Sequence, residues 1–307
     1  MIGEDSPLQG LAAFFHTVFW SLLPPMPIGQ FFADLVDWCT DNLEIFFDLS
    51  RDIIDGMIVG LTDGLLFLPA TLMVVVFAAI AFFVRGWRFG IITFFAMGLV
   101  AWSQFWIESM QTLALVLIAS ILALIIAVPV GILAAENATM AKIVRPVLDF
   151  MQTMPAFVYL IPAVAFYGIG DVPGVIATIV FCMPPGVRLT ELGIRQVDSE
   201  VVEAGESFGA RPATILTRIK LPLALPTIMA GVNQVIMLAL SMVVIAGMVG
   251  GEGLGKVIMA ALNNVDLAKG FDSGLAVVII AIFLDRVTDS LSKRTKVARV
   301  AAMRSKS

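Results

Sequence analysis

Long apolar runs dominate this chain, and they constrain its fold more than any other feature. Apolar residues make up 59% of the 307 residues and charged residues only 14%, a balance that a soluble domain of this size does not show. A helix needs about 20 apolar residues to cross the hydrocarbon core of a bilayer. We therefore predict an all-α, polytopic membrane protein with about seven transmembrane helices, at 64–84, 88–107, 111–135, 155–170, 174–190, 224–249 and 274–291.

The distribution of basic residues predicts the orientation of these spans. If the polar segment around 203–222 lies inside, all but three of the 19 Lys and Arg also fall inside, the exceptions being Arg51, Lys256 and Lys269. This follows the positive-inside rule. It predicts a multi-pass protein with its N-terminus outside the cell and its C-terminus in the cytoplasm.

Residues 1–63 differ from the rest of the chain. Seven acidic residues follow helical spacing there, at Asp34, Asp37, Asp41, Glu44, Asp48, Asp52 and Asp55. Apolar residues fill the opposite face, so we expect one or two amphipathic helices across about 30–63. Such helices could form a scaffold on the outer leaflet, or could simply pack beside the spans. The apolar run 11–23, which contains His16, is cut short by prolines but could instead belong to an eighth span.

Apolar runs and charge divide the remaining sequence into three parts. Residues 64–110 are expected to hold accessory transmembrane helices, and 111–291 the core of the transmembrane domain. Residues 292–307 form a basic cytoplasmic tail with six Lys or Arg and no acid. The two shortest spans, 155–170 and 174–190, are interrupted by Gly and Pro. They are expected to lie inside the bundle, where irregular backbone can be satisfied, or to be kinked packing helices.

A polar segment, EAGESFGARPATILTRIKLP, interrupts the apolar sequence at 203–222. Asp198 or Ser199 can cap a short helix there, with acidic residues in its first turn. Gly209 allows a sharp turn, because it has no Cβ to forbid positive φ. Pro212 suits the first turn of a second helix, and Pro222 predicts the next boundary. Acidic and basic residues balance, which favours a protein-docking surface over a nucleic-acid patch.

The spacing of this segment resembles the cytoplasmic coupling loop of permease subunits of bacterial ABC importers, the EAA loop. The matching residues are Glu203, Ala204, Gly205, Gly209, Ile219, Leu221 and Pro222, and Gly205 stands in place of the second Ala. The resemblance implies that the loop 198–222, which also includes Arg211 and Pro212, couples the spans to a separate ATPase.

Further motifs extend the resemblance over roughly 100–291. They lie at 152–162, 168–173, 185–190, 231–234 and 241–246. Together they look like the permease subunit of the glycine betaine, proline betaine, choline and carnitine uptake systems. Residues 1–60 share little of that pattern.

The resemblance implies a type I ABC importer fold, also called MetI-like, and a set of partners. Two permease copies would form the pathway, with one ATPase bound under each coupling loop. An extracytoplasmic binding protein would deliver the substrate. The permease would then be non-catalytic and carry no cofactor, because ATP and Mg²⁺ would bind the ATPase.

Candidate pathway residues follow from the chemistry of a quaternary ammonium, which prefers aromatic faces. They are Tyr159 and Tyr167, together with Asn233, Met237 and Ser241, which are spaced four residues apart on one predicted helix. For any single residue of that stripe, the sequence favours bundle packing over a role in the pathway.

Other chemistry is weakly represented. Residues 250–257 nearly spell a phosphate-binding loop but lack the Ser or Thr that ligates Mg²⁺, so we expect a glycine turn or a close approach between chain segments. No His, Cys or carboxylate cluster predicts a metal or catalytic site, and Cys39 and Cys182 are not expected to pair. The interiors of the predicted spans hold almost no ionisable residues, and Asp285 and Arg286 lie near the inner end of the last span. This argues against a proton-driven carrier, which usually needs intramembrane carboxylates or histidines. An ATP-independent carrier or osmotically gated channel, or a non-transporting scaffold, remain alternatives.

Overall fold

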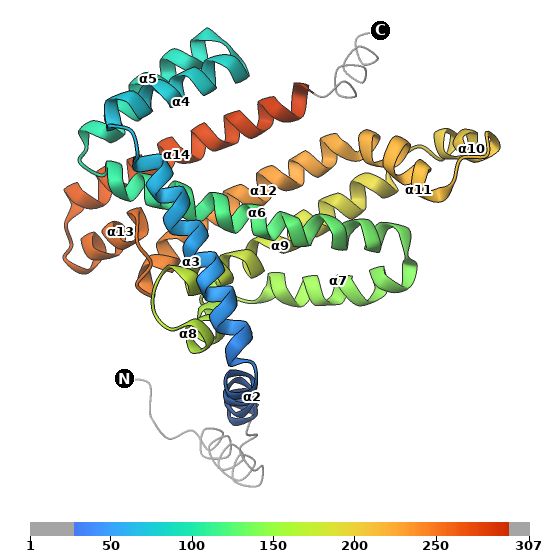
Figure 1. Cartoon of the computed structure of the whole chain (residues 1–307), viewed down its shortest axis with the longest axis horizontal. Helices are drawn as coiled ribbons and strands as arrows, with labels where there is room; N and C mark the ends of the chain where they lie inside the picture. Colours follow the sequence, from blue (N-terminus) through green and yellow to red (C-terminus); the bar gives the residue numbers. More distant parts are fainter. Residues whose placement is uncertain (1–27, 295–307) are drawn as a thin grey trace, which may run out of the picture. The chain divides into compact units, whose positions relative to one another are not determined.

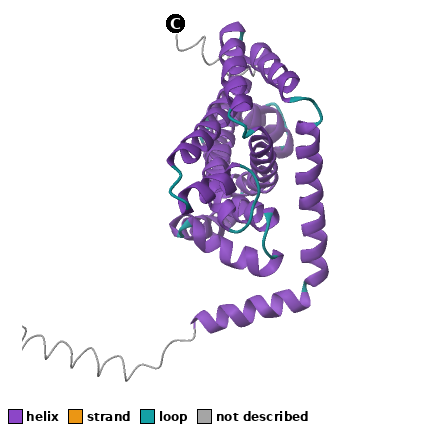
Figure 2. Ribbon diagram, turned by 90° about the vertical axis from the view of Figure 1, so that its left-hand side faces the viewer, coloured by secondary structure: helices purple, strands orange, loops and turns teal. Residues whose placement is uncertain are grey.

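The computed structural model describes residues 28–294, and within that range every regular element is a helix (Figures 1 and 2). The chain divides into two compact units, residues 1–46 and 47–307. The expectations for residues 1–27, including His16, and for the tail beyond residue 294 lie outside the described range.

The described part of the first unit contains α2 (Ile28–Asn42) and the start of α3 (Glu44–Leu66). The expectation of one or two helices across about 30–63 is confirmed. Phe31, Phe32 and Trp38 are exposed on α2. Their location relative to a membrane stays a prediction.

The second unit contains the remainder of α3 and all later helices. In chain order these are α4 (Ala70–Arg85), α5 (Trp87–Trp102), α6 (Trp106–Glu136), α7 (Ala138–Thr153), η1 (Ala156–Tyr159), α8 (Leu160–Tyr167), α9 (Asp171–Arg195), α10 (Ser199–Ser207), α11 (Pro212–Ile215), η2 (Leu216–Lys220), α12 (Leu221–Met248), α13 (Leu254–Asn263) and α14 (Leu267–Arg294). Among them η1 is a 3₁₀-helix and η2 is a π-helix.

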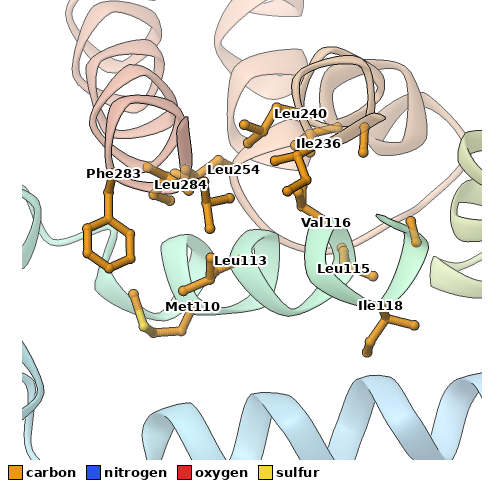
Figure 3. Close-up of a cluster of buried hydrophobic side chains, with 14 of the residues drawn as sticks. Met110, Leu113, Leu115, Val116, Ile118, Ile236, Leu240, Leu254, Phe283 and Leu284 are labelled. Atoms are coloured by element: carbon orange, nitrogen blue, oxygen red, sulfur yellow. The ribbon is translucent and has the colours of Figure 1, made fainter. Parts of the chain in front are cut away.

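The centre of this unit is formed by α6, α9 and α12, with α13 and α14 packed against α12. Its largest apolar cluster surrounds the N-terminal half of α6, where Leu113 and Val116 lie near Leu240 and Leu254 of other helices (Figure 3). Small residues let the helices approach closely, as membrane helices require. A Cβ on Gly131 of α6 would lie 2.6 Å from the Thr190 Cβ of α9.

The number of candidate spans agrees with a multi-pass protein but differs in detail from the prediction of seven. Within residues 28–294, four single helices are long and apolar enough to cross a membrane: α6, α9, the segment Pro212–Met248 and α14. Two bent pairs, α3 with α4 and α7 with η1 and α8, raise the number to six. The span predicted at 88–107 corresponds to α5, which ends at Trp102 and is shorter than the others.

Two predicted spans differ from the structure in their boundaries. The expected span 64–84 is divided at 67–69, and the chain bends by 98° there, with Pro69 preceding α4. The expected span 155–170 is only the second limb of a pair bent by 109°, and its first limb is α7. In α9, Pro184 and Pro185 are buried but do not end the helix. Each removes one helical hydrogen bond, and packing on α6 and α12 stabilises the helix nevertheless.

Candidate functional site

The loop 198–222, hereafter the coupling loop, lies at one end of α6, α9 and α12, opposite to α13 (Figure 1). It begins with α10, and Asp198 rather than Ser199 is its N-cap, since the Asp198 carboxylate accepts from the Glu200 amide at 2.9 Å. That bond satisfies one of the amides that a helix start leaves without a partner. The predicted short helix is therefore confirmed.

The turn after α10 is a complete Schellman motif. The amide of Ala210 donates to the carbonyl of Gly205 at 3.1 Å, and the amide of Gly209 donates to Glu206 at 2.8 Å. Gly209 has a φ of +75°, and no atom lies within 4 Å of the position that a Cβ would take. Glycine is required here by backbone conformation and not by lack of space.

The second limb begins with Pro212 at the first position of α11, as predicted. Pro222 lies in the first turn of α12, next to the predicted boundary, but the chain does not break there. The backbone widens into the π-turn η2, with the Leu221 amide donating to the Leu216 carbonyl, and continues directly as α12. A proline lacks the amide for the i−4 carbonyl and its ring crowds that carbonyl. The widened turn accommodates Pro222 without breaking the segment Pro212–Met248.

The two limbs of the loop pack together through Gly205. A Cβ at this position would lie 2.7 Å from the Cδ1 of Ile219. Two residues that the sequence motif places 14 positions apart are thus in direct contact. Gly205, the position at which this chain departs from the family pattern, gives Ile219 room to lie against α10.

The outer surface of the coupling loop is mixed in charge and carries one large apolar residue. Glu203, Glu206 and Arg211 are exposed. Phe208 is 92% exposed at the tip, immediately before Gly209. Sequence reasoning missed Phe208, although an aromatic residue beside the turn glycine was a visible signal. An open groove of about 370 Å³ lies beside α10 and is lined by Glu136, Arg195, Glu203, Glu206 and Lys220, among others.

Charged residues join the base of the loop to the neighbouring helices. Glu191 on α9 is buried and pairs with Arg145 of α7 at 2.7 Å and with Arg195 at 2.9 Å. Lys220 pairs with Glu136 at 2.7 Å. A buried carboxylate is stable only when charged or hydrogen-bonding partners compensate for its lost hydration.

The glycine-rich segment 249–255 lies at the opposite end of α12. The amides of residues 252, 253 and 254 donate to Asp171, Gln111 and Thr112, at 2.6, 3.2 and 2.8 Å. The close-approach reading is confirmed, since a Cβ on Gly255 would lie 2.1 Å from the Val243 carbonyl oxygen. The amides of this segment donate to oxygens of the protein itself, whereas the amides of a phosphate-binding loop would donate to a ligand. Beside it, a hydrogen bond to the Glu252 carboxylate raises the pKa of the Lys256 ammonium.

The five candidate pathway residues occupy different environments. Tyr159 is buried and its hydroxyl donates to the Met151 carbonyl, while the Tyr167 hydroxyl bonds to Ser50 of α3 at 3.0 Å. Both contacts favour packing.

On α12, Asn233 points to α14, where it donates to Asp285 at 2.9 Å and accepts from Thr288 at 3.0 Å. Met237 and Ser241 are exposed. The exposed face of α12 also includes Ala230 and Gln234, so Gln234, which sequence reasoning missed, takes the position expected for Asn233. The pathway role of these residues stays a prediction.

Within residues 28–294, no group of three or more His, Cys, Asp or Glu could hold a metal ion, and Cys39 and Cys182 are free thiols.

The chain matches a known protein family. Residues 127–297, more than half of the chain, match the family described as "binding-protein-dependent transport system inner membrane component".

Curated relatives match over most of their length. The glycine betaine transport system permease protein OpuAB of Bacillus subtilis is 44% identical over 89% of this chain and 97% of its own. The glycine betaine/carnitine transport permease protein GbuB of Listeria monocytogenes is 48% identical over 89% and 98%. The glycine betaine/proline betaine transport system permease protein ProW of Escherichia coli is 43% identical over 88% and 77%.

A solved structure resembles the same part of the fold. An inward-facing conformation of the MetNI methionine ABC transporter superposes with a TM-score of 0.58, covering 62% of this chain and 94% of that one at 20% identity. This likeness supports the type I importer fold.

Proposed function

The chain belongs to the family of binding-protein-dependent transport system inner membrane components and, within it, to the glycine betaine transport permeases, and on that premise we propose that its own cargo is a quaternary amine. It is a non-catalytic permease subunit of an ABC importer and a multi-pass protein of the inner membrane. The cargo class covers glycine betaine, proline betaine, choline and carnitine. It is supported by the names and the identity of the relatives that match almost the whole chain.

Partners follow from the same premise. The translocation pathway lies between two copies of this chain, and one ATPase binds each coupling loop. ATP and Mg²⁺ bind the ATPases. An extracytoplasmic binding protein delivers the cargo, with the N-terminus of the permease outside and the C-terminus inside. The basic residues on the coupling-loop side support this orientation.

The shape and surface of the coupling loop support ATP-driven transport. Its Schellman turn and the contact between Gly205 and Ile219 make a compact projection beyond the bundle. Glu203, Arg211 and the exposed Phe208 lie on its surface, and a large aromatic side chain of this kind suits a pocket on the ATPase. When the ATPases close around ATP, the projection moves with them and the spans turn to face outward. Cargo is released inward after hydrolysis.

The exposed face of α12 supplies the lining of the pathway. Its other sides pack against α6, α9, α13 and α14. Gln234 and Ser241 on that face are polar residues within a predicted span, where contact with lipid is unfavourable. Facing a second copy across an aqueous pathway, they line it with uncharged polar groups and the Met237 thioether. Such a lining lets a permanent cation or zwitterion pass without being trapped by a fixed charge.

Uptake into proteoliposomes tests the proposal. The vesicles contain this chain with its cognate ATPase and binding protein, and the substrates are radiolabelled glycine betaine and choline. ATP-dependent uptake supports the importer, and the preferred label identifies the cargo. Uptake without ATP would instead support a carrier or a gated channel. No uptake of any quaternary amine with all partners present would refute the proposed cargo.

A further inference from the structure

A residue before the coupling loop and one near its end are both attached to a single helix end. The Nη2 of Arg195, at the end of α9, donates to the carbonyl oxygen of Ala134 at 2.7 Å. The Nζ of Lys220, at the end of η2, donates to the Glu136 carboxylate at 2.7 Å. Ala134 and Glu136 belong to the last turn of α6. The residues that lead into and out of the loop therefore bind α6 within three positions of each other.

The chemistry of the helix end explains why these two donors bind there. The last carbonyls of an α-helix have no donor within the helix, and they carry partial negative charge. The Leu133 carbonyl accepts from the Asn137 amide, and the Arg195 guanidinium supplies a donor for Ala134. Because Ala134 is fully buried, its carbonyl has little access to water as an alternative.

Glu191 holds the Arg195 guanidinium in place. Its side chain is only 6% exposed and accepts from Arg195 and Arg145. The Glu191 carboxylate therefore pairs with Arg195 and, through Arg145, also connects Arg195 to α7. Its burial distinguishes it from the exposed ion pairs of a helical surface, whose geometry is weakly determined.

We propose that Arg195 and Lys220 are positioning residues that make the end of α6 move together with the coupling loop. The proposal rests on the function given above and assigns to this chain a mechanical connection made by Ala134, Glu136, Glu191, Arg195 and Lys220, here named the α6 clamp. Two attachments, one before the loop at Arg195 and one near its end at Lys220, fix the orientation of the α6 end relative to the loop better than either one alone. The N-terminal half of α6 is embedded in the apolar core (Figure 3), so motion of the clamp reaches the packed centre of the unit.

Transport per ATP hydrolysed, measured in proteoliposomes with all partners, is the primary test. Lys220→Met removes the Lys220–Glu136 attachment and Glu136→Gln removes its charge, and both keep the approximate size of the side chain. We expect a several-fold lower transport-to-hydrolysis ratio with hydrolysis retained. The exchanged pair Glu136→Lys with Lys220→Glu should recover at least half of the ratio, a result that loss of folding cannot produce. Lys256→Met is the matched control, because Lys256 and Glu252 form a 2.6 Å pair away from the coupling loop.

Amide hydrogen exchange on the isolated permease supplies a second readout that does not depend on transport. Lys220→Met should raise exchange several-fold in 131–136 and 199–210, while the exchanged pair should restore protection. Unchanged exchange in these segments, or a transport-to-hydrolysis ratio equal to that of Lys256→Met, would overturn the clamp. A wild-type protein without ATP-dependent uptake would refute the proposed function instead, and the exchange experiment would still decide whether the clamp exists.

Discussion

Replacement of Gly209 separates backbone conformation from steric crowding in the coupling loop. Its φ of +75° lies in the left-handed region, while the space that a Cβ would occupy is empty. An L-residue there costs roughly 1–2 kcal/mol, and a β-branched side chain costs more. Asn tolerates the same region far better. Since each 1.4 kcal/mol is about a tenfold change in an equilibrium, Gly209→Val shifts the balance between the capped turn and opened forms by roughly tenfold or more.

The assay is transport per ATP hydrolysed in proteoliposomes, with membrane insertion checked for each variant. We expect transport per ATP hydrolysed to decrease in the order wild type, Gly209→Asn, Gly209→Ala and Gly209→Val, with the Val variant uncoupled. Gly209→Asn is the matched control, because its side chain is bulkier than that of Ala but accepts positive φ. If Asn impaired coupling as much as Val, side-chain size and not φ would govern this position, and the reasoning would be refuted.

Substitutions at three other sites probe separate contacts. Phe208→Ala should weaken ATPase binding by about 2 kcal/mol, roughly 30-fold, without changing the melting temperature, since Phe208 is 92% exposed; equal affinity in a binding titration would contradict a docking role. Gly205→Leu should uncouple transport because its side chain displaces Ile219. Gly205→Ala should lower transport per ATP hydrolysed, and adding Ile219→Val, which lacks the crowded Cδ1 atom, should restore it. Additive effects of these two substitutions in a double-mutant cycle would argue against the contact. Gln234→Leu should change the KM for uptake. Asn233→Leu should chiefly lower the thermal stability, because Asn233 and not Gln234 is hydrogen-bonded to α14. The reverse pattern would exclude Gln234 from the pathway.

The coupling loop was largely predictable because its determinants are local. Asp198 caps α10, Gly209 adopts positive φ and Pro212 starts α11, each for reasons that depend on a few neighbouring residues. Pro222 lies beside the boundary between η2 and α12, as predicted, but the helical segment continues through it. Proline chemistry predicts a lost hydrogen bond but does not reveal whether the chain bends or widens into a π-turn, and the packing of the helix decides between them.

The helix α7 shows a different limit. It is amphipathic and not uniformly apolar, so a search for long apolar runs passed over it, although Asn137 was a visible N-cap that accepts from Thr139 and Met140. Its bend of 109° against the following helices is a property of the assembled unit. The same holds for the division between α3 and α4.

By itself, the sequence determined the all-helical membrane class, the approximate positions of the spans and the form of the coupling loop, since these depend on hydropathy, spacing and backbone preference along the chain. Only the tertiary structure decided which side chains from different helices are in contact. Asn233 and Gln234 are adjacent on α12, yet one bonds to α14 and the other is exposed. Likewise, Arg195 and Lys220 meet α6 from two distant segments. Such contacts depend on how the helices rotate and pack, and hydropathy leaves that rotation open.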